Sequence, residues 1–498
     1  MNKRMLWALI AGPGLAVTSL LLVFFVLGRS TAEATPGGAG AVPDLQPQTA
    51  TFTVSGTVTC QATGPLSDVE VYAWNRNTGS GDVKGVTDSS GAYHVTLEEG
   101  TYTLEFMPPS TTGLNARAFT TTQLITDTNL NVDFCICKGI WVTETVDSTG
   151  NMGGSTSLAL ESIYPYPPHI SYHDITSDSM KYAWLTGTTW LSQTVDSGGW
   201  PTSLALVPTY PHTPCIAYHD YWGWSLKYAC QTGATWAISS VAGLRSGQES
   251  TSLALEPVYP YTPHISFRLP WGTDISLHFA SLSGTDWMSG TWRLESVEPP
   301  LSRVGSWSSL ALERTYPYTP HISYYDSANG DLKHAWLSGT TWITETVDSA
   351  GDVGWYTSLA LNSSGIPRIS YFDNTNHSLK FAWLSDTTWL SETVDKTGGQ
   401  PWGRGSTSLE LDQDGLPYIS YYDAINDDLK LARFDGMVWI TQTVDSEGDV
   451  GQGSSLALNQ GGCPHISYYD ATYEDLRYAY IPRRPLVYLP LVVRNHSP

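Results

Sequence analysis

The sequence has little positive charge. Among 498 residues it contains 25 Lys and Arg against 47 Asp and Glu, which gives a formal net charge of −22. We find no cluster of cations beyond Arg483 and Arg484. Binding to nucleic acid or to another polyanion requires a basic patch, because the affinity comes from neutralising phosphates. The charge pattern therefore excludes nucleic acid as a partner.

The sequence also lacks the common catalytic motifs. It contains no nucleophile elbow, no His-Glu-x-x-His zinc motif, no glycine-rich phosphate loop and no Cys-x-x-Cys pair. Carboxylates are numerous, but none of them stands out as the pair that glycoside hydrolysis requires. These absences predict a protein that is not an enzyme.

The composition favours strands and turns over helices. Charged residues make up only 14% of the chain, whereas 20 Trp, 28 Tyr, 45 Gly and 30 Pro are present. Aromatic residues are enriched in strands, and Gly and Pro are enriched in turns. We therefore expect an all-β fold.

The N-terminus has the features of an export signal. Lys3 and Arg4 precede an uncharged stretch at residues 5–28, and Ala32–Ala34 then shows the small-x-small pattern of signal-peptidase sites. The stretch is long enough to span a bilayer if it is not cut, so residues 1–34 are predicted to be a signal peptide or a membrane anchor. Either alternative places the rest of the chain outside the cell, and membrane contact is expected only through this N-terminal hydrophobic helix.

A linker at residues 35–50 leads into a first folded domain at residues 51–139. Polar and apolar residues alternate there in segments such as Val69–Trp74 and Tyr93–Leu97, which predicts half-buried antiparallel strands. The segment Gly85–Tyr93, with its Thr-Asp-x-x-Gly turn, resembles the carboxypeptidase regulatory-like (prealbumin-like) β-sandwich family. The resemblance implies a non-catalytic spacer or adhesion module.

The remaining sequence is an internal repeat. Each unit contains Trp-x-x-x-x-Val, a Gly/Ser-rich loop, Ser-Leu-x-Leu, Ile-Ser-Tyr-x-Asp and Leu-Lys-x-Ala, which predicts four short strands. Four strands per unit are typical of a β-propeller blade, which buries its faces only against its neighbours. Seven tryptophans open the units: Trp141, Trp190, Trp236, Trp292, Trp342, Trp389 and Trp439. We therefore predict a seven-bladed β-propeller at residues 141–482.

The phase of the repeat predicts how the propeller closes. We assign Ser-Leu-x-Leu as inner strand A, Ile-Ser-Tyr-x-Asp as strand B, Leu-Lys-x-Ala as strand C and Trp-x-x-x-x-Val as outer strand D. The last unit ends at Leu476–Ala479 with no Trp strand after it, while the first begins with the unaccompanied segment 141–146. This segment is expected to serve as strand D of the last blade, which protects the open edges.

Two further resemblances concern the turns of the repeat and the C-terminus. The residues before each Trp, such as Leu185–Trp190 and Leu337–Trp342, resemble a degenerate Asp-box of sialidase-like and lectin-like propellers, without the leading Asp in most units. In those families the box is a structural turn far from the ligand, so it implies the fold and no sialidase activity. The tail at residues 483–498 resembles terminal tails of secreted bacterial proteins in its segment Tyr488–Asn495, which implies surface retention or export.

The cysteines are interpreted through the repeat. Blade 2 alone has Cys215 where other blades mostly have His, and it alone has Cys230 where several have Trp. The hairpin between them places these positions opposite each other on strands B and C, which predicts a cross-strand disulfide. In an exported chain the other four are also expected in disulfides rather than around a metal ion. Their pairing is left open: Cys60, Cys135, Cys137 and Cys463.

Carboxylates gather on the rim of the propeller that carries the B-to-C and D-to-A loops. In most blades strand B and strand D both end in Asp. One interpretation is turn capping, in which Asp accepts backbone N–H groups. The other is calcium binding, because hard cations prefer several clustered oxygens. The candidate calcium ligands are Asp348, Asp352, Asp445 and Asp449.

The opposite rim carries long A-to-B loops with Tyr-Pro pairs in blades 1–4, whereas blades 5–7 have tight turns. A turn needs no aromatic residue, so these rigid edges could stack on sugar rings or on a peptide. The alternative is that the tyrosines pack over neighbouring blades. The candidate ligand-binding residues are Tyr164, Tyr166, Tyr210, Tyr259, Tyr261, Tyr316 and Tyr318.

Together these patterns predict a monomeric, non-catalytic protein of the cell exterior whose propeller binds a glycan or a surface protein. No cofactor is expected, except calcium if the carboxylates of the B-to-C and D-to-A rim bind that ion. Two alternatives remain open: a propeller glycoside hydrolase or polysaccharide lyase acting on extracellular glycans, and a surface scaffold without a ligand. An enzyme would concentrate unusual residues at one pocket, so the near-uniformity of the repeats favours the binder.

Overall fold

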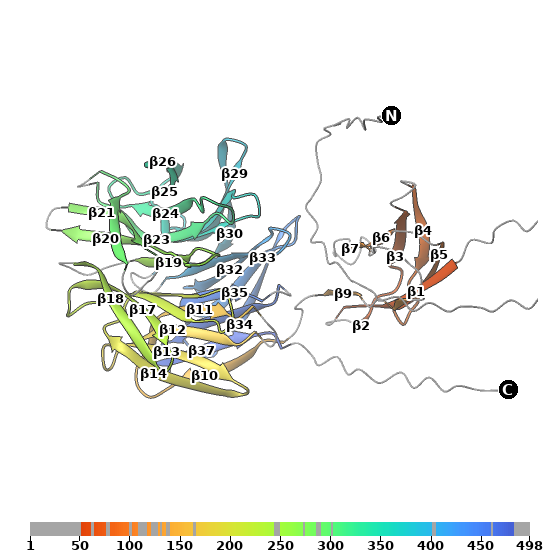
Figure 1. Cartoon of the computed structure of the whole chain (residues 1–498), viewed down its shortest axis with the longest axis horizontal. Coiled ribbons are helices and arrows are strands. Elements are labelled where there is room, and N and C mark those ends of the chain that lie inside the picture. Colours follow the sequence, from red (N-terminus) through yellow and green to blue (C-terminus); the bar gives the residue numbers. More distant parts are fainter. Residues whose placement is uncertain are drawn as a thin grey trace, which may run out of the picture. The chain divides into compact units, whose positions relative to one another are not determined.

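The computed structural model describes residues 51–60, 64–75, 80–98, 102–107, 117–120, 128–129, 132–135, 140–162, 166–243, 250–271, 274–284, 290–299, 302–400, 405–459 and 462–482. Every regular element in these ranges is a β-strand (Figure 1), as the composition predicts. A search of the same residues finds no apolar helix of membrane-spanning length. The expected leader, linker and C-terminal tail lie outside these ranges. The chain forms two compact units, residues 1–138 and 139–498, which we describe separately.

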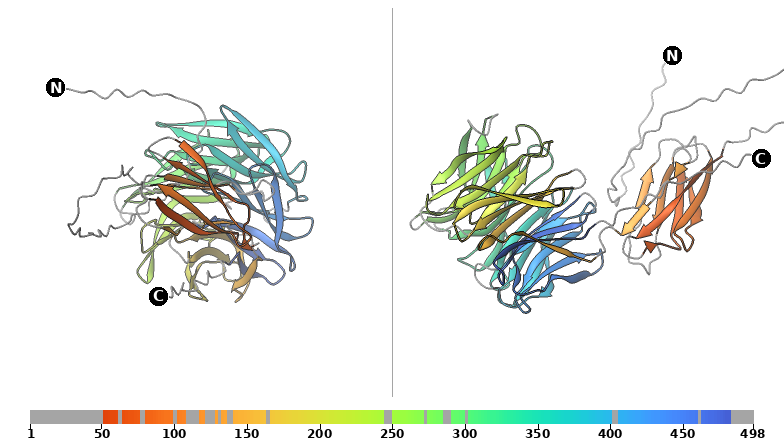
Figure 2. Two further views of the ribbon diagram at one scale, coloured as in Figure 1. Left: turned by 90° about the vertical axis from the view of Figure 1, so that its right-hand side faces the viewer. Right: turned by 90° about the horizontal axis from the view of Figure 1, so that it is seen from below.

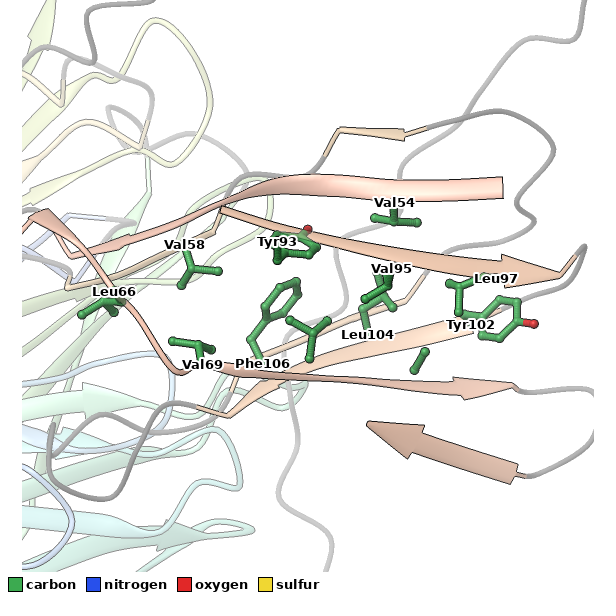
Figure 3. Close-up of a cluster of buried hydrophobic side chains, with 12 residues drawn as sticks. Val54, Val58, Leu66, Val69, Tyr93, Val95, Leu97, Tyr102, Leu104 and Phe106 are labelled. Carbon is green, nitrogen blue, oxygen red and sulfur yellow. The ribbon is translucent and has the colours of Figure 1, made fainter. Parts of the chain in front are cut away.

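The first unit contains two β-sheets around a shared core. One has the order β2-β1-β5, with β8 and β9 also paired to β1, and the other has the order β4-β3-β6-β7. The strands are β1 (Thr51–Cys60), β2 (Gly64–Pro65), β3 (Glu70–Asn75), β4 (Ser80–Val86), β5 (Ala92–Glu98), β6 (Tyr102–Met107), β7 (Arg117–Thr120), β8 (Thr128–Asn129) and β9 (Val132–Cys135). Side chains of β5 alternate between buried and exposed, so Tyr93, Val95 and Leu97 meet Leu104 and Phe106 of β6 in the core (Figure 3).

The turn before β5 depends on one aspartate and one glycine. Asp88 Oδ1 accepts the N–H groups of Ser90 and Ala92 at 2.8 and 3.0 Å. Gly91 has φ +73°, and a Cβ at this position would lie 2.2 Å from the carbonyl oxygen of Val58. Only glycine satisfies both conditions, which gives the Thr-Asp-x-x-Gly pattern a mechanical basis.

The second unit is a seven-bladed β-propeller, as the repeat predicts. Seven four-stranded antiparallel sheets have the strand order A to D, from inner to outer. Figure 2 shows the ribbon from two further sides. From blade 1 to blade 6 the strands A to D are β11 (Met152–Leu160), β12 (Pro168–Asp174), β13 (Ser179–Thr186), β14 (Thr189–Ser197); β15 (Thr202–Leu206), β16 (Pro214–Asp220), β17 (Ser225–Thr232), β18 (Thr235–Gly243); β19 (Thr251–Leu255), β20 (Pro263–Trp271), β21 (Asp274–Ser283), β22 (Thr291–Ser296); β23 (Val304–Leu312), β24 (Pro320–Asp326), β25 (Asp331–Ser338), β26 (Thr341–Asp348); β27 (Val353–Leu361), β28 (Pro367–Asp373), β29 (Ser378–Ser385), β30 (Thr388–Lys396); and β31 (Thr407–Leu411), β32 (Pro417–Asp423), β33 (Asp428–Phe434), β34 (Trp439–Asp445).

Blade 7 combines the two ends of the propeller. Its strands A to C are β35 (Val450–Leu458), β36 (Pro464–Asp470) and β37 (Asp475–Tyr480), and its strand D is β10 (Val142–Asp147). β10 runs antiparallel to β37, with Val142 opposite Tyr480. The ring is therefore closed by hydrogen bonds between the first and last strands of the propeller.

The serine of the Ser-Leu-x-Leu motif links each blade to the next. Its hydroxyl accepts the N–H of the first Leu in the motif of the following blade, at 2.9–3.0 Å. The seven pairs are Ser157–Leu204, Ser203–Leu253, Ser252–Leu310, Ser309–Leu359, Ser358–Leu409, Ser408–Leu456 and Ser455–Leu158. The last pair joins blade 7 to blade 1, so these hydrogen bonds form a complete ring around the inner strands.

Candidate binding surfaces

Strand D of each blade ends beside strands B and C of the next blade. At six of the seven junctions a carboxylate lies at the end of strand D or, in blade 3, two residues beyond it. This carboxylate accepts a hydrogen bond from a Tyr of strand B and pairs with a Lys or Arg of strand C. The six sets, which we call the junction triads, are Asp147–Tyr172–Lys181, Asp196–Tyr218–Lys227, Glu298–Tyr324–Lys333, Asp348–Tyr371–Lys380, Asp395–Tyr421–Lys430 and Asp445–Tyr468–Arg477.

In the triad between blades 7 and 1 the hydrogen bonds favour the ionised carboxylate. Burial alone would raise the pKa of Asp147, but hydrogen bonds from Lys181 and Tyr172 outweigh this effect and lower the pKa to about 2. Burial and the hydrogen bond to Asp147 raise the pKa of the Tyr172 hydroxyl, which therefore stays a donor. The ammonium group of Lys181 also lies 5.5 Å from the centre of the Tyr172 ring, where cation–π attraction adds to the pairing.

The structure does not bring the four candidate calcium ligands together. Asp348 and Asp445 belong to junction triads. Asp352 and Asp449 accept hydrogen bonds from nearby Tyr hydroxyls and from a Trp or Gln side chain. Across the described ranges no group of three or more His, Cys, Asp or Glu side chains is placed to hold a metal ion. These carboxylates thus have protein partners of their own.

The Asp that ends strand B caps the turn that follows it. One of its carboxylate oxygens accepts a backbone N–H two or three residues further along. The pairs are Asp174–Ser177, Asp220–Gly223, Asp326–Ala328, Asp373–Asn376, Asp423–Ile425 and Asp470–Thr472. These six carboxylates therefore have the turn-capping role.

The junction between blades 2 and 3 has no triad. Ala242, Phe267 and His278 occupy the positions that hold the carboxylate, the Tyr and the cation elsewhere. The carboxylate and the ammonium are replaced together, so neither is left buried without the other. Blade 3 therefore meets blade 2 through apolar contacts where the other blades use charge.

On the opposite rim, blades 2, 3 and 4 each present one highly exposed tyrosine. Tyr210, Tyr259 and Tyr316, which we call the tyrosine rim, are 79%, 72% and 85% exposed. In each loop the second ring stands at right angles to this tyrosine, with ring centres 5.9–6.4 Å apart. The pairs are Tyr210–His212, Tyr259–Tyr261 and Tyr316–Tyr318. The first aromatic residue of each loop thus faces solvent, and the second supports it.

The supporting rings are fixed by the backbone and by the neighbouring loop. Tyr261 and Tyr318 have φ +59° and +57°, and each donates its N–H to the carbonyl three residues earlier, at 2.7 and 2.8 Å. The hydroxyl of Tyr261 lies 3.0 Å from that of Thr209 in blade 2. His212 lies 3.3 Å from the hydroxyl of Ser162 in blade 1. The long loops of adjacent blades are therefore linked sideways.

Blade 1 differs from this pattern. Tyr166, in the position of the supporting ring, is only 8% exposed and has φ +60°. Its burial places it in packing rather than on a ligand surface, which corrects its assignment as a candidate ligand residue. Tyr164 lies outside the described residues. The described tyrosine rim consequently extends over three blades rather than four.

Cys215 and Cys230 form the predicted cross-strand disulfide. They are opposite each other in the register of β16 and β17, with their Cα atoms 4.2 Å apart. Cys463 is also disulfide-bonded. The side chains of Cys60, Cys135 and Cys137 lie outside the described part of the chain, so the pairing expected for them stays a prediction.

The repeat pattern does not single out one further exposed group of aromatic residues. Tyr221, Trp222 and Trp224 occupy the B-to-C turn of blade 2, and Trp200 lies in the loop before β15. They are 43%, 70%, 44% and 43% exposed, respectively. An alignment of the turns would have identified them, because the other four-residue B-to-C turns contain no Trp: residues 175–178, 327–330, 374–377, 424–427 and 471–474.

Comparison with known proteins finds only distant structural similarity. No family model and no curated protein matches the sequence. AofleA from Arthrobotrys oligospora is 13% identical over 62% of this chain and 90% of its own, with a TM-score of 0.42. The SapL1 lectin, solved with alpha methyl fucoside, is 10% identical over 60% of this chain and 98% of its own, with a TM-score of 0.41. The Hadza microbial sialidase Hz136 is 12% identical over 88% of this chain and 91% of its own, with a TM-score of 0.37. Similarity at this level carries no conclusion about ligand or activity.

Proposed function

We propose that this chain is an exported, non-catalytic binding protein whose propeller recognises a carbohydrate through the tyrosine rim. The observation that carries the proposal is the exposure of Tyr210, Tyr259 and Tyr316 at one loop position of three adjacent blades. Large aromatic side chains usually bury much of their surface, and a turn needs no aromatic residue. The three rings are therefore available for contact with a ligand.

The chemistry of the rim fits a sugar. Each tyrosine offers an apolar ring that can stack on the C–H face of a pyranose and a hydroxyl that can hydrogen-bond to it. The position recurs from blade to blade, which suits a ligand that itself repeats, such as a glycan chain. The supporting rings and turn hydrogen bonds fix the loops before binding, so little ordering is required when the ligand arrives.

A propeller glycoside hydrolase or lyase is the second candidate, and one residue favours it. Glu410 occupies the variable position of Ser-Leu-x-Leu, where the other six blades have Ala. Burial raises the pKa of Glu410 to about 7, against the opposing effect of Arg314. A carboxyl group with a raised pKa can serve as a general acid. Release of new reducing ends or of unsaturated sugars, lost in Glu410→Gln, would identify such an enzyme.

The test is a glycan array probed with the full chain and with the triple variant Tyr210→Ala, Tyr259→Ala, Tyr316→Ala. Tyr473→Ala is the control, because this tyrosine is 58% exposed in the B-to-C turn of blade 7. We expect the triple variant to lose affinity by roughly tenfold or more, while the control binds as the wild type does. Binding should also survive a chelator. Equal binding by the triple variant, or no glycan binding by the wild type, would refute the proposal and favour a protein partner or a scaffold.

The other parts of the proposal come from the sequence. Residues 1–34 would direct the chain out of the cell or anchor it in the membrane. The prealbumin-like domain at residues 51–139 would act as a spacer between this N-terminal segment and the propeller. Fractionation of cells that express the full chain, followed by N-terminal sequencing, would distinguish a cut leader from a retained anchor.

A further inference from the structure

The B-to-C turn of blade 2 carries aromatic side chains that its own folding does not require. It joins β16 to β17 through residues Tyr221 to Trp224, and Asp220 caps it by accepting the N–H of Gly223 at 2.8 Å. Turns of the same length in the other blades have the same kind of cap without any Trp. The cap and not the aromatic residues therefore sets the conformation of this turn.

Trp224 adopts a backbone conformation that is costly for a large side chain. Its φ is +50°, in the left-handed region that large side chains rarely adopt. Other blades fill the corresponding position with Asp178, Gly330, His377, Asp427 or Glu474, also at positive φ. A backbone conformation that is costly for a large side chain is an observation from which a functional role can be inferred. Trp224 is also 44% exposed, so packing in the interior does not explain it.

The exposed rings lie together. Tyr221 stands at 88° to Trp222 with ring centres 5.4 Å apart, and it is inclined by 34° to Trp224 at 5.5 Å. The loop that contains Trp200 runs beside the base of this turn, because Gly199 donates its N–H to the carbonyl of His219 at 2.9 Å. We call Trp200, Tyr221, Trp222 and Trp224 the aromatic ridge.

The ring geometry distinguishes between classes of ligand. A quaternary ammonium group is bound where several ring faces surround one point. Here Trp222 and Trp224 each pack against Tyr221, which leaves the outer surfaces of the rings, above all that of Trp222 at 70% exposure, as a ridge. An outward-facing indole suits a flat apolar surface such as the C–H face of a pyranose ring.

The charges described around the ridge disfavour an anionic ligand. The ammonium of Lys227, which follows the turn, is already paired with Asp196 and Asp220 at 2.7 Å each. The chain as a whole has a net charge of −22. Sulfated or uronic glycans, nucleic acids and acidic membranes would thus meet net repulsion, and among the described residues beside this turn Lys227 is not free to offset it.

We propose that the aromatic ridge of blade 2 is a second binding site, for a neutral glycan, separate from the tyrosine rim. The two lie at opposite ends of β16, since the A-to-B loop precedes Pro214 and the ridge follows Asp220. The proposal does not depend on the tyrosine rim, and either site can fail while the other binds.

The test uses the full chain and uncharged oligosaccharides as probes, namely cellohexaose, mannohexaose, xylohexaose and chitohexaose, measured by titration calorimetry. The ridge variant is Trp222→Ala. Its matched control is Ile425→Ala, which changes the corresponding position of the blade 6 turn, itself 61% exposed. Both experiments are repeated in the background of the triple tyrosine-rim variant, which isolates the ridge.

We expect at least one neutral probe to bind in the triple-rim background, with affinity reduced by roughly tenfold or more by Trp222→Ala and unchanged by Ile425→Ala. The tryptophan fluorescence change on binding should disappear in the same variant. Absence of binding to every neutral probe, equal affinity of Trp222→Ala and Ile425→Ala, or binding to anionic glycans alone would overturn the proposal. Loss of binding only in the rim variant would refute the ridge and leave the tyrosine rim intact.

Discussion

Asp147, at the end of the strand that completes blade 7, accepts a hydrogen bond at 2.6 Å from the hydroxyl of Tyr172 in blade 1. It also pairs with Lys181, and both charged residues are less than one-tenth exposed. The first strand of the propeller therefore holds the last blade against the first by a buried ion pair as well as by its place in the sheet. A buried pair gains little net stability, but loss of one partner leaves an uncompensated charge.

Substitution Asp147→Ala should consequently destabilise the propeller by about 3–5 kcal/mol, because Lys181 would stay buried without a counter-charge. Urea unfolding followed by tryptophan fluorescence measures this loss. The matched control is Asp147→Ala combined with Tyr172→Phe and Lys181→His, which reproduces the residues found between blades 2 and 3. We expect the triple variant to recover a large part of the lost stability. A triple variant as unstable as the single one would contradict the interpretation.

The sequence was sufficient to predict features that repeat. Each strand motif recurs seven times, so the blade, its strand order and the opposition of Cys215 and Cys230 could be inferred from spacing alone. The roles of Asp348 and Asp445 could not be predicted from the repeat, because their partners lie in the next blade, 23 to 32 residues along the chain. Contacts of this kind depend on how one blade packs against another.

The same limit explains the tyrosine loops. Sequence places two aromatic residues in each loop but does not say which of them faces solvent. The left-handed turn at Tyr261 and Tyr318 decides this, since it turns the second ring against the first and leaves Tyr259 and Tyr316 outside. The turn itself becomes visible only in three dimensions, as does the burial of Tyr166 at the same loop position of blade 1.

Stability should fall as the solution becomes mildly acidic. Burial lowers the pKa of His219 to about 4 and that of His321 to about 3, compared with about 6.5 in an unfolded chain. Between the folded and the unfolded pKa of each histidine, the unfolded state binds more protons than the folded state. The free energy of unfolding therefore decreases as the pH falls below about 6.5. The stabilisation from Asp147 persists to lower pH, because its pKa is about 2.

His219→Phe tests this assignment, since Phe372 occupies the corresponding position of blade 5. The decrease in melting temperature between about pH 7 and about pH 5 should be smaller in this variant than in the wild type. His94→Phe, at an exposed position of the first unit, is the control and should leave the pH dependence unchanged. An unchanged pH dependence in His219→Phe would show that this histidine is not responsible.

The disulfide of blade 2 should stabilise the propeller measurably. It closes a segment with a sequence separation of 15 residues, for which the chain-entropy estimate is about 3 kcal/mol. The double variant Cys215→Ala, Cys230→Ala removes the bridge without leaving a free thiol. We expect a lower unfolding midpoint in this variant in the absence of reductant. Equal midpoints would mean that the surrounding hairpin already restricts the unfolded chain.

The junction between blades 2 and 3 also lacks a hydroxyl pair that the other six junctions have, buried at five of them and partly buried at the sixth. Those pairs are Ser171–Thr202, Ser266–Ser308, Ser323–Thr357, Ser370–Thr407, Ser420–Ser454 and Ser467–Thr156. Ala217 stands at the position of the serine, and within the described residues Thr251 Oγ1 is buried without a hydrogen-bond partner. Such an unsatisfied hydroxyl carries a desolvation cost that nothing offsets.

Ala217→Ser should therefore raise the stability of the protein, by about 1 kcal/mol, because the new hydroxyl would satisfy Thr251. Thr251→Val should also stabilise, since it removes the unsatisfied group. If the two residues act through one hydrogen bond, Ala217→Ser will give no gain once Thr251 has become Val, and a double-mutant cycle by urea unfolding measures this coupling. Independent, additive effects would instead show that the serine gains its stability from another partner.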